Sequence, residues 1–183
     1  MRYRPLLALI LVIFPALYAL AESELAPRED APVHPFLPIA EVLRNPRCLN
    51  CHVSGDTPKQ TDARRLHIPN VKGGPDGKGA GMKCATCHRE KPGVVPGAPG
   101  WRLAPPQMAW EGLSDADLCR TLTDLTKNGG KDPTAIAQHI LSDELVAYGW
   151  NPGGKRSPVP VSKEELATIL QYWVFAGAPC PSN

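Results

Sequence analysis

The 183-residue sequence is poor in features that mark several common protein classes. It has no strand-like run longer than a few residues, which argues against a sheet protein. After residue 21 no hydrophobic run reaches the about 20 residues that a membrane-spanning helix needs. No stripe of Lys and Arg stands out, and the 20 basic and 18 acidic side chains nearly balance, so we expect no nucleic-acid partner.

The first 21 residues have the composition of a secretory signal peptide. Arg2 and Arg4 precede the apolar run Leu6–Leu20, and Ala19–Ala21 supplies small residues at the positions that a signal peptidase reads. A retained membrane anchor is the alternative, although the run is short for a bilayer and Pro15 interrupts it. We expect cleavage after residue 21, export to the periplasm, and no membrane span in the mature chain.

Proline and glycine are abundant, with 21 and 16 residues. Long regular elements should therefore be scarce, and much of the chain should be loop. Residues 22–40 carry several prolines without apolar periodicity and are interpreted as an extended tether. Residues 41–183 are expected to form one domain.

Four short helices are expected in and around this domain. The first covers Ile39–Asn45, and the third covers Pro133–Leu141 with His139 on its inward face. The second begins at the N-cap Ser114, stops at Gly129 and places Leu118, Leu122 and Leu125 on one face. The last begins with the capping box at Ser162 and ends at Gly177.

Four of the six cysteines lie in two identical patterns, Cys48–His52 and Cys84–His88, each of the form C-x-x-C-H. Cysteines three residues apart on one helical turn project toward the same face, and the histidine follows beneath them. This pattern is the attachment signature of a c-type haem, in which the thiols form thioethers and the histidine ligates iron. We call Cys48, Cys51 and His52 the first motif, and Cys84, Cys87 and His88 the second motif.

Two other readings of the paired cysteines are weaker. Zinc sites built from C-x-x-C pairs usually separate the pairs by about 15–20 residues and need no histidine after both. A thioredoxin-like redox pair would lie in a βαβ unit, which neither flank suggests.

With these motifs and the export signal, the chain resembles exported dihaem c-type cytochromes. The resemblance implies two covalently bound haem c groups in a mainly α, irregular multihaem domain, with Pro/Gly-rich loops wrapped around them. The stretches Leu103–Trp110 and Ala176–Pro181 are similar to those of a group labelled as a subunit of isoquinoline 1-oxidoreductase. That similarity implies a molybdenum-dependent oxidoreductase as electron donor.

The second axial ligand of each iron would decide the chemistry. Histidine or methionine closes the iron to outside ligands, whereas an open iron binds a small molecule. The favoured candidates are His67, His139 and Met108, ahead of His34 and Met82. The sequence leaves open which residue serves which iron.

Cys119 and Cys180 remain after the motif cysteines are assigned. In an oxidising compartment two such cysteines most simply form a disulfide, here between the helix after Ser114 and the C-terminal tail. A pair of buried thiols or a redox-active pair is the alternative.

Together these observations predict a periplasmic electron-transfer protein that passes single electrons between redox partners and is not an enzyme in its own right. The alternative is a dihaem enzyme or sensor in which one iron lacks a sixth protein ligand and binds peroxide or a gas. A third possibility is a docking subunit that residues 22–38 join to a larger complex.

Overall fold

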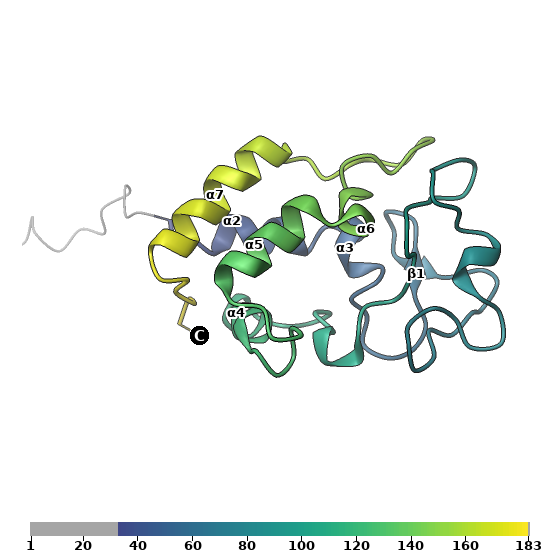
Figure 1. Cartoon of the computed structure of the whole chain (residues 1–183), viewed down its shortest axis with the longest axis horizontal. Coiled ribbons are helices and arrows are strands. Elements are labelled where there is room, and N and C mark those ends of the chain that lie inside the picture. Colours follow the sequence, from purple (N-terminus) through teal and green to yellow (C-terminus); the bar gives the residue numbers. More distant parts are fainter. Residues whose placement is uncertain (1–32, 183) are drawn as a thin grey trace, which may run out of the picture. The chain divides into compact units, whose positions relative to one another are not determined.

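The structure is a computed structural model that describes residues 33–182, in which all regular elements are short (Figure 1). The helices are α2 (Leu37–Leu43), α3 (Pro46–Leu49), α4 (Asp115–Thr123), α5 (Pro133–Ser142), α6 (Glu144–Ala147) and α7 (Lys163–Phe175). The strands β1 (Lys59–Gln60) and β2 (Arg65–Leu66) pair antiparallel, and the 3-10 turns are η1 (Cys84–Thr86) and η2 (Pro106–Met108). This architecture agrees with the expected mainly α, irregular fold class. Across the described part of the chain, no helix is long and apolar enough to cross a membrane.

Four helices surround one apolar core. α7 packs against α5 and α2, and α4 packs against α2 and α5. The fully buried side chains include Phe36, Leu118, Leu170 and Trp173, and the rings of Phe36 and Trp173 lie 5.7 Å apart. We call residues 34–50 and 103–182 the helical region, and residues 51–102 the loop region.

The helix starts follow from capping. The side chain of Ser114 accepts a hydrogen bond from the Asp117 amide, and that of Ser162 accepts one from the Glu165 amide, which satisfies amides that the first turn leaves free. Asp132 caps α5 in the same way. The predicted helix starts at Ser114, Pro133 and Ser162 are confirmed, whereas the cap at Asp132 was not predicted.

The second predicted helix is shorter than expected. α4 ends at Thr123, because the backbone of Asp124 is extended and its carboxylate accepts hydrogen bonds from the amide and hydroxyl of Thr126. Such local bonds compete with the helix. Leu125, expected on the buried face, is therefore 57% exposed, and Gly129 lies beyond the helix.

The compact unit begins at His34, earlier than the expected boundary at residue 41. Phe36 and Ile39 are fully buried, and α2 begins at Leu37. Pro38 stands in the first turn of α2, where its missing amide leaves no bond unmade. The signal peptide expected over 1–21, and the tether up to residue 32, lie outside the described residues.

The expected disulfide between Cys119 and Cys180 is present, with the two Cα atoms 5.5 Å apart. It joins α4 to the C-terminal tail, and the Pro179 carbonyl accepts a hydrogen bond from the indole of Trp173. The tail is thus fixed to the core of the helical region.

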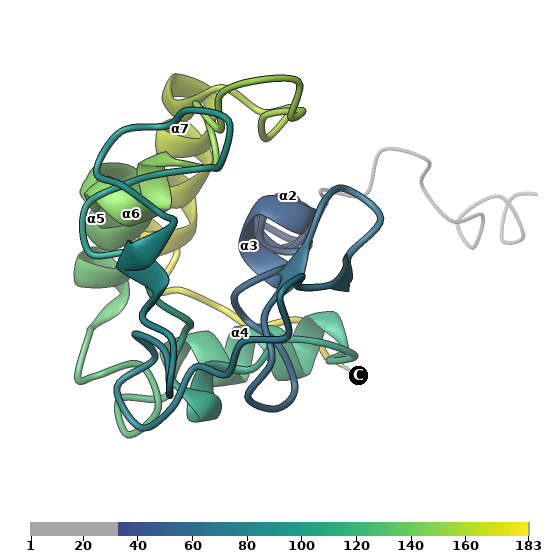
Figure 2. The same cartoon turned by 90° about the vertical axis from the view of Figure 1, so that its right-hand side faces the viewer.

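The loop region is built differently (Figure 2). Its only regular elements are β1, β2 and η1. Its only buried hydrophobic residues are Val53 and Ala98, and it contributes no residue to the main core cluster. Gly79 has a φ of +104°, and a Cβ there would lie 2.1 Å from the Met82 carbonyl oxygen, so the turn before the second motif needs glycine.

Candidate functional site

Two cavities open beside the two motifs. The cavity at the first motif has a volume of about 300 Å³ and is lined by Cys48, Cys51 and His52. The cavity at the second motif has a volume of about 640 Å³ and is lined by Cys84, Cys87 and His88. Both volumes lie in the range of about 300–1,000 Å³ that cofactor and ligand sites occupy. We call these cavities the first pocket and the second pocket.

The two motifs share one backbone geometry. The Asn45 side chain caps α3, and the His52 amide then donates to the Cys48 carbonyl at 3.1 Å. In the second motif the His88 amide donates to the Cys84 carbonyl at 2.9 Å. Each motif is therefore a single helical turn, which brings its histidine round to the cysteine side.

Each motif histidine is held in place by a hydrogen bond at its Nδ1 atom. Nδ1 of His52 lies 2.8 Å from the Met108 carbonyl oxygen, and Nδ1 of His88 lies 2.7 Å from the Pro96 carbonyl oxygen. A carbonyl oxygen only accepts hydrogen bonds, so Nδ1 carries the proton and Nε2 keeps its lone pair. This arrangement is typical of metal-ligating histidines, whose second nitrogen is fixed by a neighbouring acceptor.

Burial keeps both motif histidines neutral. It lowers the pKa of His52 to about 4, and it also lowers the pKa of His88, because a charged imidazolium loses its hydration in each pocket wall. The neutral imidazole is the form that binds a metal.

A tryptophan stacks on each motif histidine. The rings of Trp110 and His52 are 3.4 Å apart between centroids, and those of Trp101 and His88 are 4.3 Å apart, with interplanar angles of 10° and 4°. Stacking fixes the imidazole plane as well as its tautomer. Sequence reasoning gave these tryptophans no role, although both lie outside helices in a chain that has only four.

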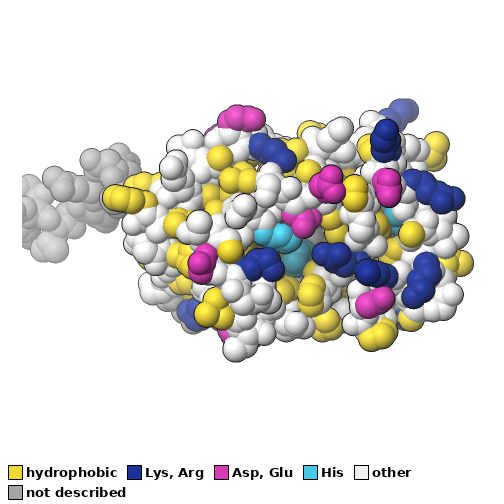
Figure 3. Space-filling view, viewed as in Figure 1, with side chains coloured by type: hydrophobic (Ala, Val, Ile, Leu, Met, Phe, Trp, Pro, Cys, Tyr) yellow, Lys and Arg dark blue, Asp and Glu magenta, His cyan; other side chains and the backbone are white. Residues whose placement is uncertain are grey.

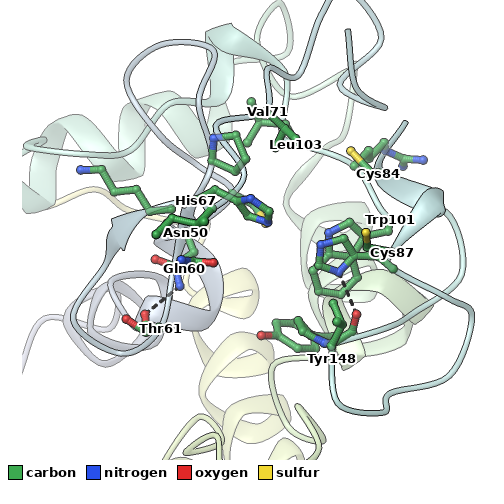
Figure 4. Close-up of a pocket in the computed structure, with 18 of the residues that line it drawn as sticks. Asn50, Gln60, Thr61, His67, Val71, Cys84, Cys87, Trp101, Leu103 and Tyr148 are labelled. Atoms are coloured by element: carbon green, nitrogen blue, oxygen red, sulfur yellow. Dashed lines mark hydrogen bonds between the residues drawn. The ribbon is translucent and has the colours of Figure 1, made fainter. Parts of the chain in front are cut away.

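His67 lies in the second pocket opposite the second motif. Its ring centroid is 5.9 Å from that of His88, and its Nδ1 is 3.0 Å from the Pro69 carbonyl oxygen, so its Nε2 also keeps a lone pair. Imidazole–metal bonds are about 2 Å long, and two rings on opposite sides of one metal therefore have centroids about 6 Å apart. Figure 4 shows His67 on one wall of the pocket and Cys84, Cys87 and Trp101 on the facing wall.

His139 lies in the first pocket with the first motif. It projects from α5, and its Nδ1 lies 3.4 Å from the Asp143 carboxylate. It is near enough to His52 for its charge to lower the pKa of His52. We expected His139 among core residues, but 42% of its side chain is exposed because the pocket opens beside α5.

The remaining candidates lie elsewhere. Met108 is buried in the wall of the first pocket, but its carbonyl binds Nδ1 of His52, which places its backbone on the side of that ring away from Nε2. Met82 lines the second pocket and is 46% exposed. His34 lines neither pocket, and its Nδ1 accepts a hydrogen bond from the Phe36 amide, unlike the other four histidines.

The two pockets share one wall. Six residues line both of them: Arg47, Cys51, Trp101, Arg102, Leu103 and Tyr148. The Arg47 side chain is only 2% exposed, forms an ion pair with Asp62 and donates to the Tyr148 hydroxyl at 3.1 Å. Trp101 contacts Tyr148 edge to face, with the ring centroids 4.8 Å apart.

All four motif cysteines are free thiols. Burial raises the pKa of Cys48 to about 12 and that of Cys51 to about 11, and the nearby Cys84 contributes to the rise at Cys51. Residues 33–182 contain no group of three or more His, Cys, Asp and Glu side chains placed to hold a metal ion. A haem iron needs no such group, because the porphyrin supplies its equatorial ligands.

Comparisons with known proteins give no further information on this site. No protein-family model, curated protein or solved structure matches this chain.

Proposed function

We propose that this chain is an electron-transfer protein that carries two covalently attached haem c groups, one in each pocket. The observation that carries the proposal is the matched set of four histidines. Each pocket holds a motif histidine and a second histidine, and the Nδ1 atom of all four faces an oxygen, so that Nε2 is free.

The motif thiols would form the thioether bonds, and His52 and His88 would be the proximal ligands. His139 would close the first iron and His67 the second. Met108 ranks below these two histidines as a candidate ligand, because its backbone carbonyl already accepts a hydrogen bond from Nδ1 of His52. A bound haem c supplies one-electron redox chemistry, with a potential set by its axial ligands and its burial.

The loop region supports the same proposal. Four of its exposed hydrophobic side chains line the second pocket: Ile68, Met82, Val94 and Val95. Large exposed apolar groups that converge on one cavity indicate a ligand-binding surface. A flat apolar cofactor would cover these side chains and give the loop region the core that its own residues do not form.

The shared wall favours electron exchange inside one domain. Cys51 lines both pockets, and Trp101 stacks on His88 while also lining the first pocket. Groups bound in both pockets would be near neighbours. This arrangement suits a carrier that accepts an electron at one centre and passes it on from the other.

The periplasmic location and the donor remain proposals. The export signal supports the periplasm, where redox proteins would be the partners. Leu103–Trp110, which resembles the isoquinoline 1-oxidoreductase group, binds the first motif here: the Ala104 amide donates to the Cys51 carbonyl, and the Trp110 amide to the His52 carbonyl. The similarity therefore concerns the segment that packs against the first motif. The proposal of a molybdenum-dependent oxidoreductase as electron donor is based on the label of that group.

The test is near-infrared magnetic circular dichroism of the oxidised, haem-loaded protein, with His67→Ala, His139→Ala and the control His34→Ala. The wild-type protein and the His34→Ala variant should show two low-spin irons with two histidine ligands each. Each of the other variants should convert one iron to high spin. Unchanged spectra of both variants would contradict the ligand assignment.

The same spectra test the alternative function. If the wild-type protein itself shows one high-spin iron, that iron is open to small molecules, and the carrier proposal gives way to an enzyme or sensor. Binding of carbon monoxide to the reduced wild-type protein is the independent measurement, and a carrier with two closed irons should bind none.

A further inference from the structure

Charge is distributed unevenly between the two regions. The loop region, residues 51–102, contains nine basic and four acidic side chains, whereas the helical region, residues 34–50 and 103–182, contains eight basic and ten acidic ones. The near neutrality of the whole chain thus hides a positively charged loop region. Figure 3 shows Lys and Arg side chains gathered over this part of the molecule.

Most of these cations have no ionic partner. Lys59 and Arg64 pair with Glu111. Seven other cations of the loop region are exposed and form no ion pair with a described residue: Arg65, Lys72, Lys78, Lys83, Arg89, Lys91 and Arg102. Unpaired surface charge of one sign creates a field that steers oppositely charged molecules.

The second pocket opens among these cations. Lys72, Lys83 and Arg102 lie in its wall, and Arg65, Lys78, Arg89 and Lys91 lie on the same loops outside it. Propionates of a haem inside the pocket would therefore face only part of the positive charge. The apolar side chain of Leu66, which does not line the pocket, is 64% exposed beside Arg65.

The second motif also lies nearer to the surface than the first. Cys87 is exposed, whereas the other three motif cysteines, Cys48, Cys51 and Cys84, are partly buried. Contact with another protein is thus easiest at the second motif.

We propose that the rim of the second pocket is the docking surface for a redox protein with an acidic surface, and that electrons enter or leave through the second haem. This inference rests on the proposed function. The exposed cations without ion pairs suit such a partner, because charge complementarity speeds the encounter of the two proteins.

The experiment measures oxidation of the reduced, haem-loaded full-length protein by stopped flow. The oxidants are ferricyanide, an anion, and tris(phenanthroline)cobalt(III), a cation. A rise in salt from about 0.01 M to about 0.1 M should slow the reaction with ferricyanide several-fold and should not slow that with the cobalt complex. Poly-L-glutamate, as a mimic of an acidic surface, should slow the ferricyanide reaction at low salt.

Two matched variants locate the effect. Lys78→Glu with Lys91→Glu should lower the low-salt ferricyanide rate about threefold or more and weaken its salt dependence. Arg120→Glu with Lys163→Glu makes the same change of charge on the helical region and should leave both nearly unchanged. An equal effect of the two double variants would overturn the docking surface.

Haem absorbance distinguishes an error in the docking surface from an error in the proposed function. Intact absorbance with the same salt dependence for both oxidants would overturn the docking surface alone. Absence of covalently bound haem from the wild-type protein would overturn the proposed function itself.

Discussion

Residues 34–50 and 103–182 bury nearly all of the hydrophobic side chains that leave the solvent, whereas residues 51–102 bury only Val53 and Ala98. The helical region is held by a packed apolar core and a disulfide. The loop region is held by hydrogen bonds, by ion pairs to Glu111, and by glycines that allow close backbone contacts. A region of this length has little apolar burial of its own, and the proposed haem groups would supply the missing apolar contacts.

The largest expected effect is loss of order in the loop region alone. Cys84→Ala with Cys87→Ala prevents attachment at the second motif, so trypsin should cleave at Lys72 and Lys83 about tenfold faster or more than in the loaded protein. Sites in the helical region, such as Lys163, should keep their rate. Mass spectrometry of timed digests measures both. Equal acceleration at all sites would show that the two regions unfold together.

The core of the helical region is expected to be the most sensitive to a single substitution. Trp173 is fully buried, so Trp173→Ala should lower the free energy of unfolding by about 3–5 kcal/mol. Its neighbour Tyr172 is 62% exposed, and Tyr172→Ala should change it by no more than about 0.5 kcal/mol. Urea unfolding monitored by circular dichroism measures both, and similar losses would contradict the assigned core.

Removal of the disulfide should have a somewhat smaller effect. Cys119→Ala with Cys180→Ala opens a link between residues 61 apart and should lower the free energy of unfolding by about 2–4 kcal/mol. The haem content should not change, because the motif cysteines are separate. Misattached or missing haem in this variant would show that the loop region depends on the disulfide after all.

The smallest expected effect is at the junction of the two regions. Glu111 accepts hydrogen bonds from Lys59, Arg64 and the Ser54 amide, and the bond from Lys59 is the main cause of its lowered pKa. A carboxyl whose pKa is lower when folded stabilises the protein above its ordinary pKa of about 4.3, and this contribution disappears as the pH falls through the folded value.

Glu111→Gln should therefore be less stable than wild type at about pH 7, and the difference should shrink toward about pH 3. Urea midpoints at the two pH values measure this. Glu90→Gln, an exposed substitution in the loop region, is the control and should show little difference at either pH. A difference that grows on acidification would contradict the assigned role of Glu111.

The helical region could be predicted from the sequence to a large extent. Ser114 and Ser162 begin helices by local capping, Pro133 occupies a first helical position, and the apolar spacing of Leu166, Leu170 and Trp173 is a local pattern too. The pairing of Cys119 with Cys180 followed from counting. The early end of α4 could not be predicted from the apolar pattern. That pattern does not show that the Asp124 carboxylate accepts a hydrogen bond from the Thr126 amide and so forms a turn in place of helix.

The candidate site was predictable only in part. The spacing of the C-x-x-C-H motifs is a local pattern from which haem attachment is predicted, and the small number of histidines limits the candidate axial ligands to a few residues. The assignment of His139 to the first pocket and His67 to the second needs long-range packing, as do the stacked tryptophans. Such contacts join distant segments, and no local pattern encodes them.

The position of the disulfide has a consequence for the order of maturation. The disulfide closes a covalent loop from Cys119 to Cys180. This loop contains α5 with His139, but neither motif lies within it. Oxidation of the two cysteines can therefore precede or follow cofactor attachment without trapping either motif in a covalent loop. Once folded, Cys48 and Cys51 have raised pKa values and remain protonated, which makes them poor partners for exchange with that disulfide. The fold thus keeps the two disulfide cysteines apart from the four motif thiols.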